Sequence, residues 1–148
     1  SLKPINANHD TEYHSSSVYG GSFDYQWPLS SWLSTSLMVH ESGGEGSMPT
    51  KSEYKYYKSG IIGLQLKIWM GPLYLGVHGG QYYLTWIESM SAYSGIQQAG
   101  GSGYSIGFET SSGWFLVAFS DQSETFSFDE MPDQQVEGNR VMLGYRWK

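Results

Sequence analysis

One stretch of the chain, residues 60–77, constrains the fold more than any other. Its content of Ile, Leu and Trp suggests a membrane helix, but Gln65 and Lys67 lie in its middle and Gly71-Pro72 divides it. Proline breaks a helix interior, and a spanning helix needs about 20 consecutive apolar residues. The apolar residues instead occupy every second position, which is the period of a β-strand. The stretch therefore predicts two strands joined by a tight turn, with an apolar face made of Ile62, Leu64, Leu66, Ile68, Met70, Leu73, Leu75 and Val77.

The same alternation recurs in five other segments, and no segment has the period of a helix. The composition agrees, because 19 Gly and 16% aromatic residues replace the Ala, Leu, Glu and Lys that build helical bundles. The length of 148 residues is that of one domain. We therefore expect an all-β fold with seven readable strands, the other five at residues 21–27, 33–40, 104–109, 115–120 and 141–148.

The connections between these segments alternate in length. Tight turns are predicted at residues 28–31, at Gly71-Pro72 and at residues 111–113, where Pro, Gly and Ser concentrate. Between them lie three long polar stretches, residues 42–58, 88–102 and 121–139, which we expect to be loops. This layout predicts an antiparallel up-and-down transmembrane β-barrel of about eight strands, with short periplasmic turns and long extracellular loops.

Alternation alone does not say whether the apolar face points inward, as in a soluble barrel, or outward to lipid. The opposite face carries mainly Ser, Gly and Gln, which suit the crowded interior of a narrow barrel. Aromatic residues gather near the strand ends, as at two bilayer interfaces. Lipid on the apolar face is therefore expected, and a soluble calycin-like barrel is the alternative. One aromatic belt is expected at the short turns (Trp27, Trp32, Trp69, Tyr74, Trp114, Tyr145, Trp147) and one towards the loops (Tyr54, Tyr56, Tyr57, Tyr82, Tyr83, Trp86).

Three short motifs carry a family resemblance. The chain ends in Gly144-Tyr145-Arg146-Trp147 before Lys148, Tyr19-Gly20-Gly21 opens its first strand, and Gly113-Trp114 forms a turn. In these features, and in its plan over residues 15–148, it resembles the small eight-stranded bacterial outer-membrane β-barrels of the outer-membrane protein A, X and W type. The resemblance implies a polar N-terminal segment at residues 1–17 and a barrel at residues 18–148. It further implies the outer membrane of a Gram-negative bacterium, in contact with lipid and lipopolysaccharide.

The strand count leaves a question at the start of the barrel. Barrels of this family have an even number of strands, so an upward strand should precede residues 19–27. Residues 1–17 contain Pro4, Asn6, Asn8 and Asp10 and show no apolar face. The last strand nevertheless needs a partner, because unpaired backbone groups in lipid cost several kcal/mol each. Three sources remain open: residues 2–8 pair despite their sequence, the first strand is absent from this chain, or another chain supplies it.

Four charged residues are expected at one level of the barrel interior, near the short turns: Asp24, Lys67, Glu109 and Arg146. Two acids and two bases balance, which predicts a buried ion-pair network that plugs an interior only wide enough for side chains. The polar residues Gln26, Gln65, His78 and His40 are expected to point into the same interior. For the histidines we favour hydrogen-bonded interior positions over a metal site or a proton-sensitive gate.

No catalytic or cofactor site is predicted. His14-Ser15 resembles the His/Ser pairs of outer-membrane lipid A deacylases, but adjacent residues do not give a triad its geometry. The chain has no Cys, and the acidic residues of one loop, Asp129, Glu130, Asp133 and Glu137, match no metal-binding spacing. The net charge of −6 excludes nucleic acid as a partner, because that binding needs a basic surface.

The sequence thus predicts a non-enzymatic, porin-like outer-membrane protein with a plugged lumen, whose loops mediate interaction or envelope integrity. A protein partner is expected to bind through the loops or beside the strand at residues 141–147. One alternative is a narrow channel or a conduit for small or hydrophobic solutes, with Met38, Ile61, Leu116 and Met142 facing inward. A lipid A-modifying enzyme and a soluble ligand-binding barrel are the remaining alternatives.

Overall fold

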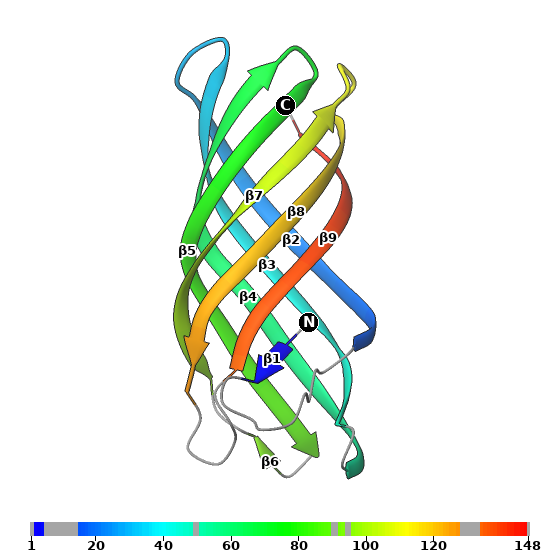
Figure 1. Cartoon of the computed structure of the whole chain (residues 1–148). Coiled ribbons are helices and arrows are strands. Elements are labelled where there is room, and N and C mark those ends of the chain that lie inside the picture. Colours follow the sequence, from blue (N-terminus) through cyan, green and yellow to red (C-terminus); the bar gives the residue numbers. More distant parts are fainter. Residues whose placement is uncertain are drawn as a thin grey trace.

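The chain folds entirely into β-structure over the residues that the structure, a computed structural model, describes: 2–4, 15–48, 51–89, 92–93, 96–127 and 134–147. This part of the chain contains no helix long and apolar enough to cross a membrane. The structure has seven long strands, β2 to β5 and β7 to β9, and two short ones, β1 and β6 (Figure 1). The strands are β1 (Leu2–Pro4), β2 (Ser15–Pro28), β3 (Leu33–Met48), β4 (Lys51–Met70), β5 (Leu73–Ser89), β6 (Ala92–Tyr93), β7 (Gln97–Glu109), β8 (Trp114–Phe126) and β9 (Gln134–Tyr145).

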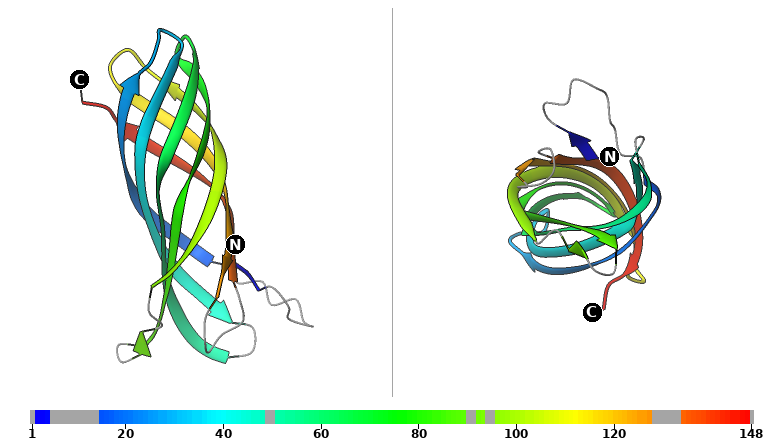
Figure 2. Two further views of the ribbon diagram at one scale, coloured as in Figure 1. Left: turned by 90° about the vertical axis from the view of Figure 1, so that its left-hand side faces the viewer. Right: turned by 90° about the horizontal axis from the view of Figure 1, so that it is seen from below.

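The long strands form one up-and-down antiparallel sheet in the order β9-β8-β7-β5-β4-β3-β2, with β1 beside β9 and β6 beside β5. The sheet curls on itself into a half-barrel, which is seen along its axis in Figure 2. The predicted all-β, antiparallel up-and-down arrangement is therefore confirmed. We call the concave side of the sheet the lumen and the convex side the outer wall.

Tight turns connect the strands at one end, as predicted. The β4–β5 turn contains Gly71, whose φ of 68° lies in the left-handed region that glycine tolerates best. The β2–β3 turn is held by Ser30, whose Oγ accepts a hydrogen bond of 3.1 Å from the amide of Leu33. In the β7–β8 turn Gly113 has a φ of 94°, and a Cβ there would lie 2.8 Å from the carbonyl oxygen of Arg146. This end is called the short-turn end below.

At the opposite end the strands continue through stretches that the sequence analysis expected to be loops, and that expectation is wrong. β3 and β4 remain paired from Ser42↔Ser59 through Ser47↔Tyr54, well inside the expected loop at residues 42–58. β5 extends to Ser89, and β8 extends to Phe126. Most of the described residues in these stretches therefore lie on strands rather than in loops.

The two faces of the sheet differ sharply in chemistry. Large apolar side chains stand exposed along the outer wall, for example Leu64 and Tyr104, while the lumen buries Lys67, Gln65 and Ser36. On β8 the expected faces are exchanged: Val117 and Phe119 are buried in the lumen and Leu116 is half exposed outside. The exposed outer positions include Phe23, Tyr25, Leu37, Ile62, Leu64, Leu66, Ile68, Met70, Leu73, Leu75, Val77, Tyr104, Ile106, Phe108, Leu116, Val141 and Leu143.

Strand β9 pairs with β1 at its N-terminal end. Leu2, Lys3 and Pro4 of β1 pair antiparallel with Val136, Gln135 and Gln134 of β9. The idea that residues 2–8 pair despite their sequence is therefore correct for residues 2–4, and residues 5–8 lie outside the described part of the chain.

Candidate functional site in the polar lumen

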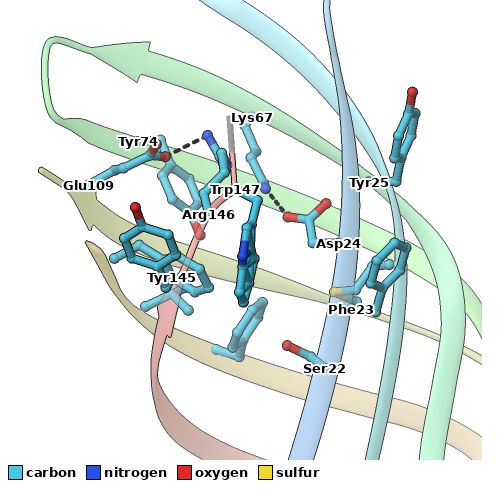
Figure 3. Close-up of a pocket in the computed structure, with 14 residues that line it drawn as sticks. Ser22, Phe23, Asp24, Tyr25, Lys67, Tyr74, Glu109, Tyr145, Arg146 and Trp147 are labelled. Carbon is cyan, nitrogen blue, oxygen red and sulfur yellow. Dashed lines mark hydrogen bonds and ion pairs between the residues drawn. The ribbon is translucent and has the colours of Figure 1, made fainter. Parts of the chain in front are cut away.

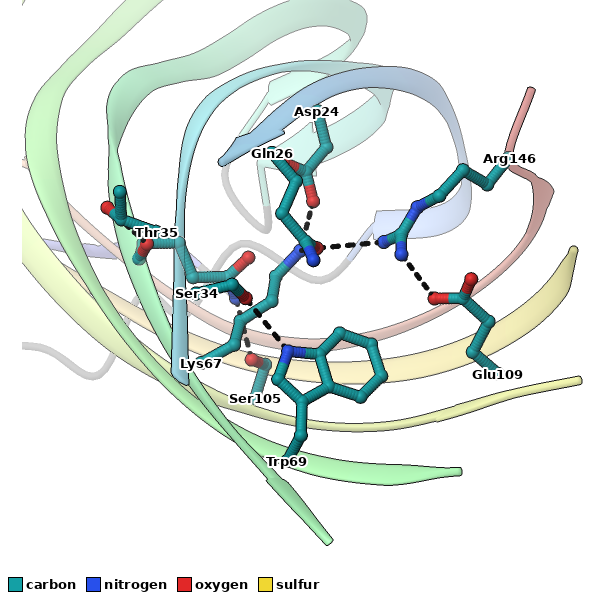
Figure 4. A network of polar contacts seen from close by, with 10 residues as sticks. Asp24, Gln26, Ser34, Thr35, Lys67, Trp69, Ser105, Glu109 and Arg146 are labelled. Carbon is teal, nitrogen blue, oxygen red and sulfur yellow. Dashed lines mark hydrogen bonds and ion pairs between the residues drawn. The ribbon is translucent and has the colours of Figure 1, made fainter. Parts of the chain in front are cut away.

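The predicted cluster of charged residues lies in the lumen at the short-turn end (Figure 4). Lys67 on β4 is 1% exposed, and its ammonium forms an ion pair with the carboxylate of Asp24 on β2. The same Nζ donates a hydrogen bond of 3.3 Å to Oε1 of Gln26. A buried ammonium is stable only when its protons are bonded, and these two partners on β2 supply the acceptors.

A second ion pair lies beside the first. The guanidinium of Arg146, one residue past the end of β9, contacts Glu109 Oε2 at 2.6 Å. It also donates a hydrogen bond of 3.0 Å to Oε1 of Gln26. Gln26 therefore accepts hydrogen bonds from both cations and joins the two ion pairs, as Figure 4 shows. The structure brings the four charged residues together as two pairs linked through one amide. We call these five residues the lower cluster, because levels are counted from the short-turn end, which is uppermost in Figure 1.

Two aromatic residues that were expected in the outer belt lie in the lumen instead. The indole Nε1 of Trp69 donates a hydrogen bond of 2.8 Å to Ser34 Oγ, and its ring lies 4.9 Å from that of Tyr74. Tyr74 is buried, and the ammonium of Lys67 lies 5.2 Å from its ring centroid. Trp69 and Tyr74 thus close the lower cluster on one side and pack against its cations.

Close packing of the lumen depends on small residues at specific positions. A Cβ added to Gly107 would lie 2.1 Å from a ring carbon of Tyr74, so only glycine fits beside that ring. Gln65 is buried and donates a hydrogen bond of 2.7 Å to Ser105 Oγ across the lumen. The Ser and Gly content of the lumen face therefore makes room for the long polar side chains.

A second charged cluster lies in the lumen towards the opposite end. Asp121 on β8 accepts a hydrogen bond of 3.0 Å from the hydroxyl of Tyr82 and lies 2.7 Å from Nε2 of His78. Its other oxygen lies 2.6 Å from the guanidinium of Arg140. We call Asp121, His78, Tyr82 and Arg140 the upper cluster. The alternation of β5 correctly predicts His78 in the lumen, but it does not predict its partners, because the pattern of β8 ends at residue 120 and Asp121 falls in a predicted loop.

The upper cluster contains two parts of a catalytic triad but lacks a nucleophile. His78 uses Nε2 for Asp121, and its Nδ1 has no hydrogen-bond partner among the described residues. His40 is also buried in the lumen, with Nε2 unpartnered within the same part of the chain. A triad requires a hydroxyl or thiol in hydrogen-bond reach of the imidazole. His14, the other histidine considered, lies outside the described residues.

The described residues contain no group of three or more His, Asp or Glu side chains that could hold a metal ion. Of the acidic residues considered at residues 129–137, Glu137 lies on β9 and the other three lie outside the described part of the chain.

The remaining aromatic residues of the expected belt at the short turns stand on the outer wall. Trp27, Trp32 and Trp114 are exposed near the turns, and Tyr145 packs edge-to-face against Trp114 with ring centroids 5.4 Å apart. Trp147 is exposed beside Tyr145 at 5.5 Å. In the belt expected towards the loops, Tyr82 is instead buried in the lumen. The side chains of Trp86, Tyr54, Tyr56 and Tyr57 lie outside the described part of the structure.

The apolar outer wall ends in polar residues at the level of Lys58 and Glu41. Their side chains form an ion pair of 3.4 Å and are more than half exposed. Burial raises the pKa of the neighbouring Tyr83, with Glu41 raising it further and Lys58 lowering it. Between this level and the short turns, Ile62 to Met70 spans nine residues of β4, close to the length of a strand that crosses a bilayer at a tilt.

A cavity of about 420 Å³ reaches from the lumen to the space between β2 and the end of β9 (Figure 3). Phe23, Asp24 and Tyr25 line it on the β2 side. Tyr145, Arg146 and Trp147 line it on the β9 side, while Phe115, Val117 and Phe119 form its apolar floor. Comparison of the chain with protein-family models, with characterised proteins and with solved structures finds no match.

Proposed function

We propose that the protein is a transmembrane β-barrel of the bacterial outer membrane. The observation that supports this is the distribution of side chains, which is inverted relative to a soluble barrel. Leu64, Tyr104 and Val141 are 61%, 66% and 71% exposed on the outer wall, whereas Lys67 is 1% exposed in the lumen. Exposed apolar patches on soluble monomers rarely exceed a few hundred Å², and the outer wall is apolar along every long strand.

The lumen is sealed in this proposal rather than open. The interior of an eight-stranded barrel is just wide enough for its side chains. The lower cluster occupies the short-turn end, and the upper cluster occupies the lumen above it. In this proposal the two layers of paired charges, each held by contacts between several strands, block the passage of water and ions along the lumen. The protein then acts through the polar strand ends and connections beyond the Lys58–Glu41 level, by contact with lipopolysaccharide or a protein partner, and it carries out no catalysis.

A second candidate function is a conduit for small hydrophobic molecules. The cavity beside β2 favours it, because Phe115, Val117 and Phe119 give an apolar lining that reaches the outer wall. Of the residues that the sequence analysis expected to line such a path, Met38 and Ile61 are buried in the lumen and Met142 packs against the same core. Leu116 faces outward and cannot contribute.

Two measurements test the proposal. First, the protein should require detergent for extraction from membranes and should migrate differently on gels before and after boiling; extraction by salt or alkaline carbonate alone would overturn the membrane location. Second, the purified protein in planar bilayers should be electrically silent. Steady conductance would favour a channel, and saturable uptake of a hydrophobic probe without conductance would favour the conduit.

A further inference from the structure

One cavity of the lumen lies between the lower and upper clusters and opens to the side. Asp24 and Arg146 of the lower cluster line it at the short-turn end. Farther from the short turns it is lined by Phe119, whose ring centroid lies 5.9 Å from that of His78 and 5.5 Å from the guanidinium carbon of Arg140. The opening lies between β2 and the end of β9 (Figure 3). In the proposed barrel a ligand therefore enters through the wall, from the bilayer, and not along the lumen.

The lining of this cavity is mainly apolar. Met38, Phe115 and Val117 line it together with Phe119, and Met38 and Val117 belong to the buried core of the sheet. Its volume of about 420 Å³ lies near the lower limit of sites that bind small molecules, which range over about 300–1,000 Å³. The space therefore suits one hydrocarbon chain, whereas a bilayer lipid with two or more acyl chains is too large for it.

The polar end of the cavity carries balanced charge. Lys67 pairs with Asp24, and Arg146 pairs with Glu109, so the four ionised groups sum to zero. A ligand head with a charge of its own would leave one charge without a counterion in a site shielded from water, which is costly. The charge balance therefore favours a neutral head.

Hydrogen-bonding capacity is left over at the same end. Within the described part of the chain, Lys67 donates to Oδ2 of Asp24, and no donor reaches the other carboxylate oxygen, Oδ1. The side chain of Asp24 is 26% exposed and that of Lys67 only 1%, so the carboxylate faces the cavity and the ammonium does not. The guanidinium of Arg146 is also partly exposed there. A hydroxyl group both donates and accepts, so it fits an acceptor and a donor side by side.

We propose that this cavity binds a single-chain amphiphile with a neutral, hydroxyl-bearing head, of the monoacylglycerol class. The chain lies against Val117 and Phe119, and the head donates a hydrogen bond to Asp24 and accepts one from Arg146. The inference names a ligand class for the conduit that is the second candidate function, and it rests on that function only for the source of the ligand in the bilayer.

Photolabelling tests the site. The protein is refolded into phosphatidylcholine vesicles that contain decanoylglycerol with a diazirine at the end of its chain, and mass spectrometry identifies the labelled residues. Labelling of Met38 and Phe119 should saturate, and unlabelled decanoylglycerol should displace it. Val117→Phe fills part of the cavity and should abolish the saturable labelling, whereas the matched control Leu116→Phe, on the outer wall, should leave it unchanged. Labelling confined to the outer wall, or labelling that does not saturate, overturns the proposal.

Competition between head groups tests the recognition of the head. The competitors are decanoylglycerol, decyl sulfate and decyltrimethylammonium, which share the chain length and differ in charge. The two charged competitors should bind the wild-type protein more weakly than decanoylglycerol, on the order of tenfold.

Two substitutions change the charge balance in the same direction. Asp24→Asn and Glu109→Gln each leave one positive charge in excess at the cavity, and each should make decyl sulfate the best competitor. Either variant is sufficient if the other does not fold. An unchanged order of competitors in a folded variant, or a charged head preferred by the wild-type protein, overturns the neutral head.

The outcome for this site is separable from the outcome for the proposed function. Extraction by alkaline carbonate would refute the membrane location, and the labelling can still be measured in water with the probe below its critical micelle concentration. Saturable labelling of Met38 and Phe119 without uptake of the probe across the membrane would refute the conduit and leave the binding site in place. Uptake without labelling of these two residues would refute the binding site.

Discussion

Arg146 donates a hydrogen bond of 3.0 Å to Gln26, although the two residues are 120 positions apart in the chain. Gln26 lies on β2 and Arg146 directly follows β9, so this contact links the two ends of the sheet. The same amide oxygen accepts a hydrogen bond from Lys67. Gln26 is therefore the residue through which the two ion pairs of the lower cluster become one network, and its replacement is the most direct test of that network.

Gln26→Leu keeps the approximate size of the side chain and removes the shared acceptor. Hydrogen bonds to charged groups contribute about 1.5–3 kcal/mol, so the free energy of unfolding should fall by about that amount. Urea unfolding in lipid vesicles, followed by Trp fluorescence, measures it. The matched control is Gln81→Leu on the exposed outer side of β5, which should change stability little. Equal effects of the two substitutions would show that Gln26 has no linking role.

Lys67→Ala should be among the most destabilising single changes in the lumen. It leaves the Asp24 carboxylate without its main cation, and breaking one partner of a buried pair costs about 3–5 kcal/mol. The control is Lys58→Ala, which removes the exposed pair with Glu41 and should cost at most about 1 kcal/mol. The temperature at which the unboiled gel band shifts compares the two. Unchanged melting of Lys67→Ala would contradict the network.

The double variant Lys67→Met with Asp24→Leu separates charge from packing. Replacing a buried ion pair by apolar residues of similar volume is often neutral or stabilising. We therefore expect the double variant to unfold at or above the wild-type urea concentration, although Lys67→Met alone is destabilised. If the double variant is as unstable as the single one, the pair's contacts with Gln26 and Tyr74, rather than its charge balance, determine stability.

The sequence predicts the direction of a lumen side chain only where apolar and polar residues alternate along its strand. On β4 the alternation of Leu64, Gln65, Leu66 and Lys67 distinguishes the two faces unambiguously, and the structure agrees. On β8 both faces of residues 115–119 are apolar, so no alternation could show that Phe119 points inward. Trp69 shares its face of β4 with Gln65 and Lys67, so the strand period places its side chain inward, where Ser34 accepts its N–H. The prediction of an outer belt for Trp69 followed its residue type and not this period.

The strand ends show a second limit of sequence patterns. Beyond the apolar wall both faces of a strand are polar, so the alternation that identifies a strand disappears while the backbone pairing continues, as at Ser42↔Ser59. For this reason the sequence predicts a loop at Asp121 and gives no sign of the upper cluster. Asp121 follows Phe119 by two residues and so shares the lumen side of β8, but the sequence gives no sign of which side that is, because both faces of residues 115–119 are apolar.

Gly107→Ala tests the close packing around the lower cluster. The added Cβ would lie 2.1 Å from the Tyr74 ring, and overpacking of this kind typically costs about 1–3 kcal/mol. Gly21→Ala on β2 is the matched control, because nothing lies within 4 Å of the Cβ position there. The control should be neutral in the vesicle unfolding assay. The combination of Gly107→Ala with Tyr74→Ala should recover less than full stability, since it removes the clash but opens a void.

Leu64→Arg distinguishes a lipid-facing wall from a solvent-facing one. Leu64 is 61% exposed on the outer wall, in the middle of the apolar run of β4. In water a charged residue at such a position is well tolerated, whereas on the lipid face of a barrel near the midplane Arg costs about 2–4 kcal/mol. Gln81→Arg, at the polar margin of the same wall, should cost at most about 1 kcal/mol, because the penalty falls towards the interface. Folding yields into vesicles at a series of urea concentrations measure both. Equal and small effects would place Leu64 in water and would count against the membrane barrel, because an Arg at the middle of a lipid-facing wall should cost more than one at its margin.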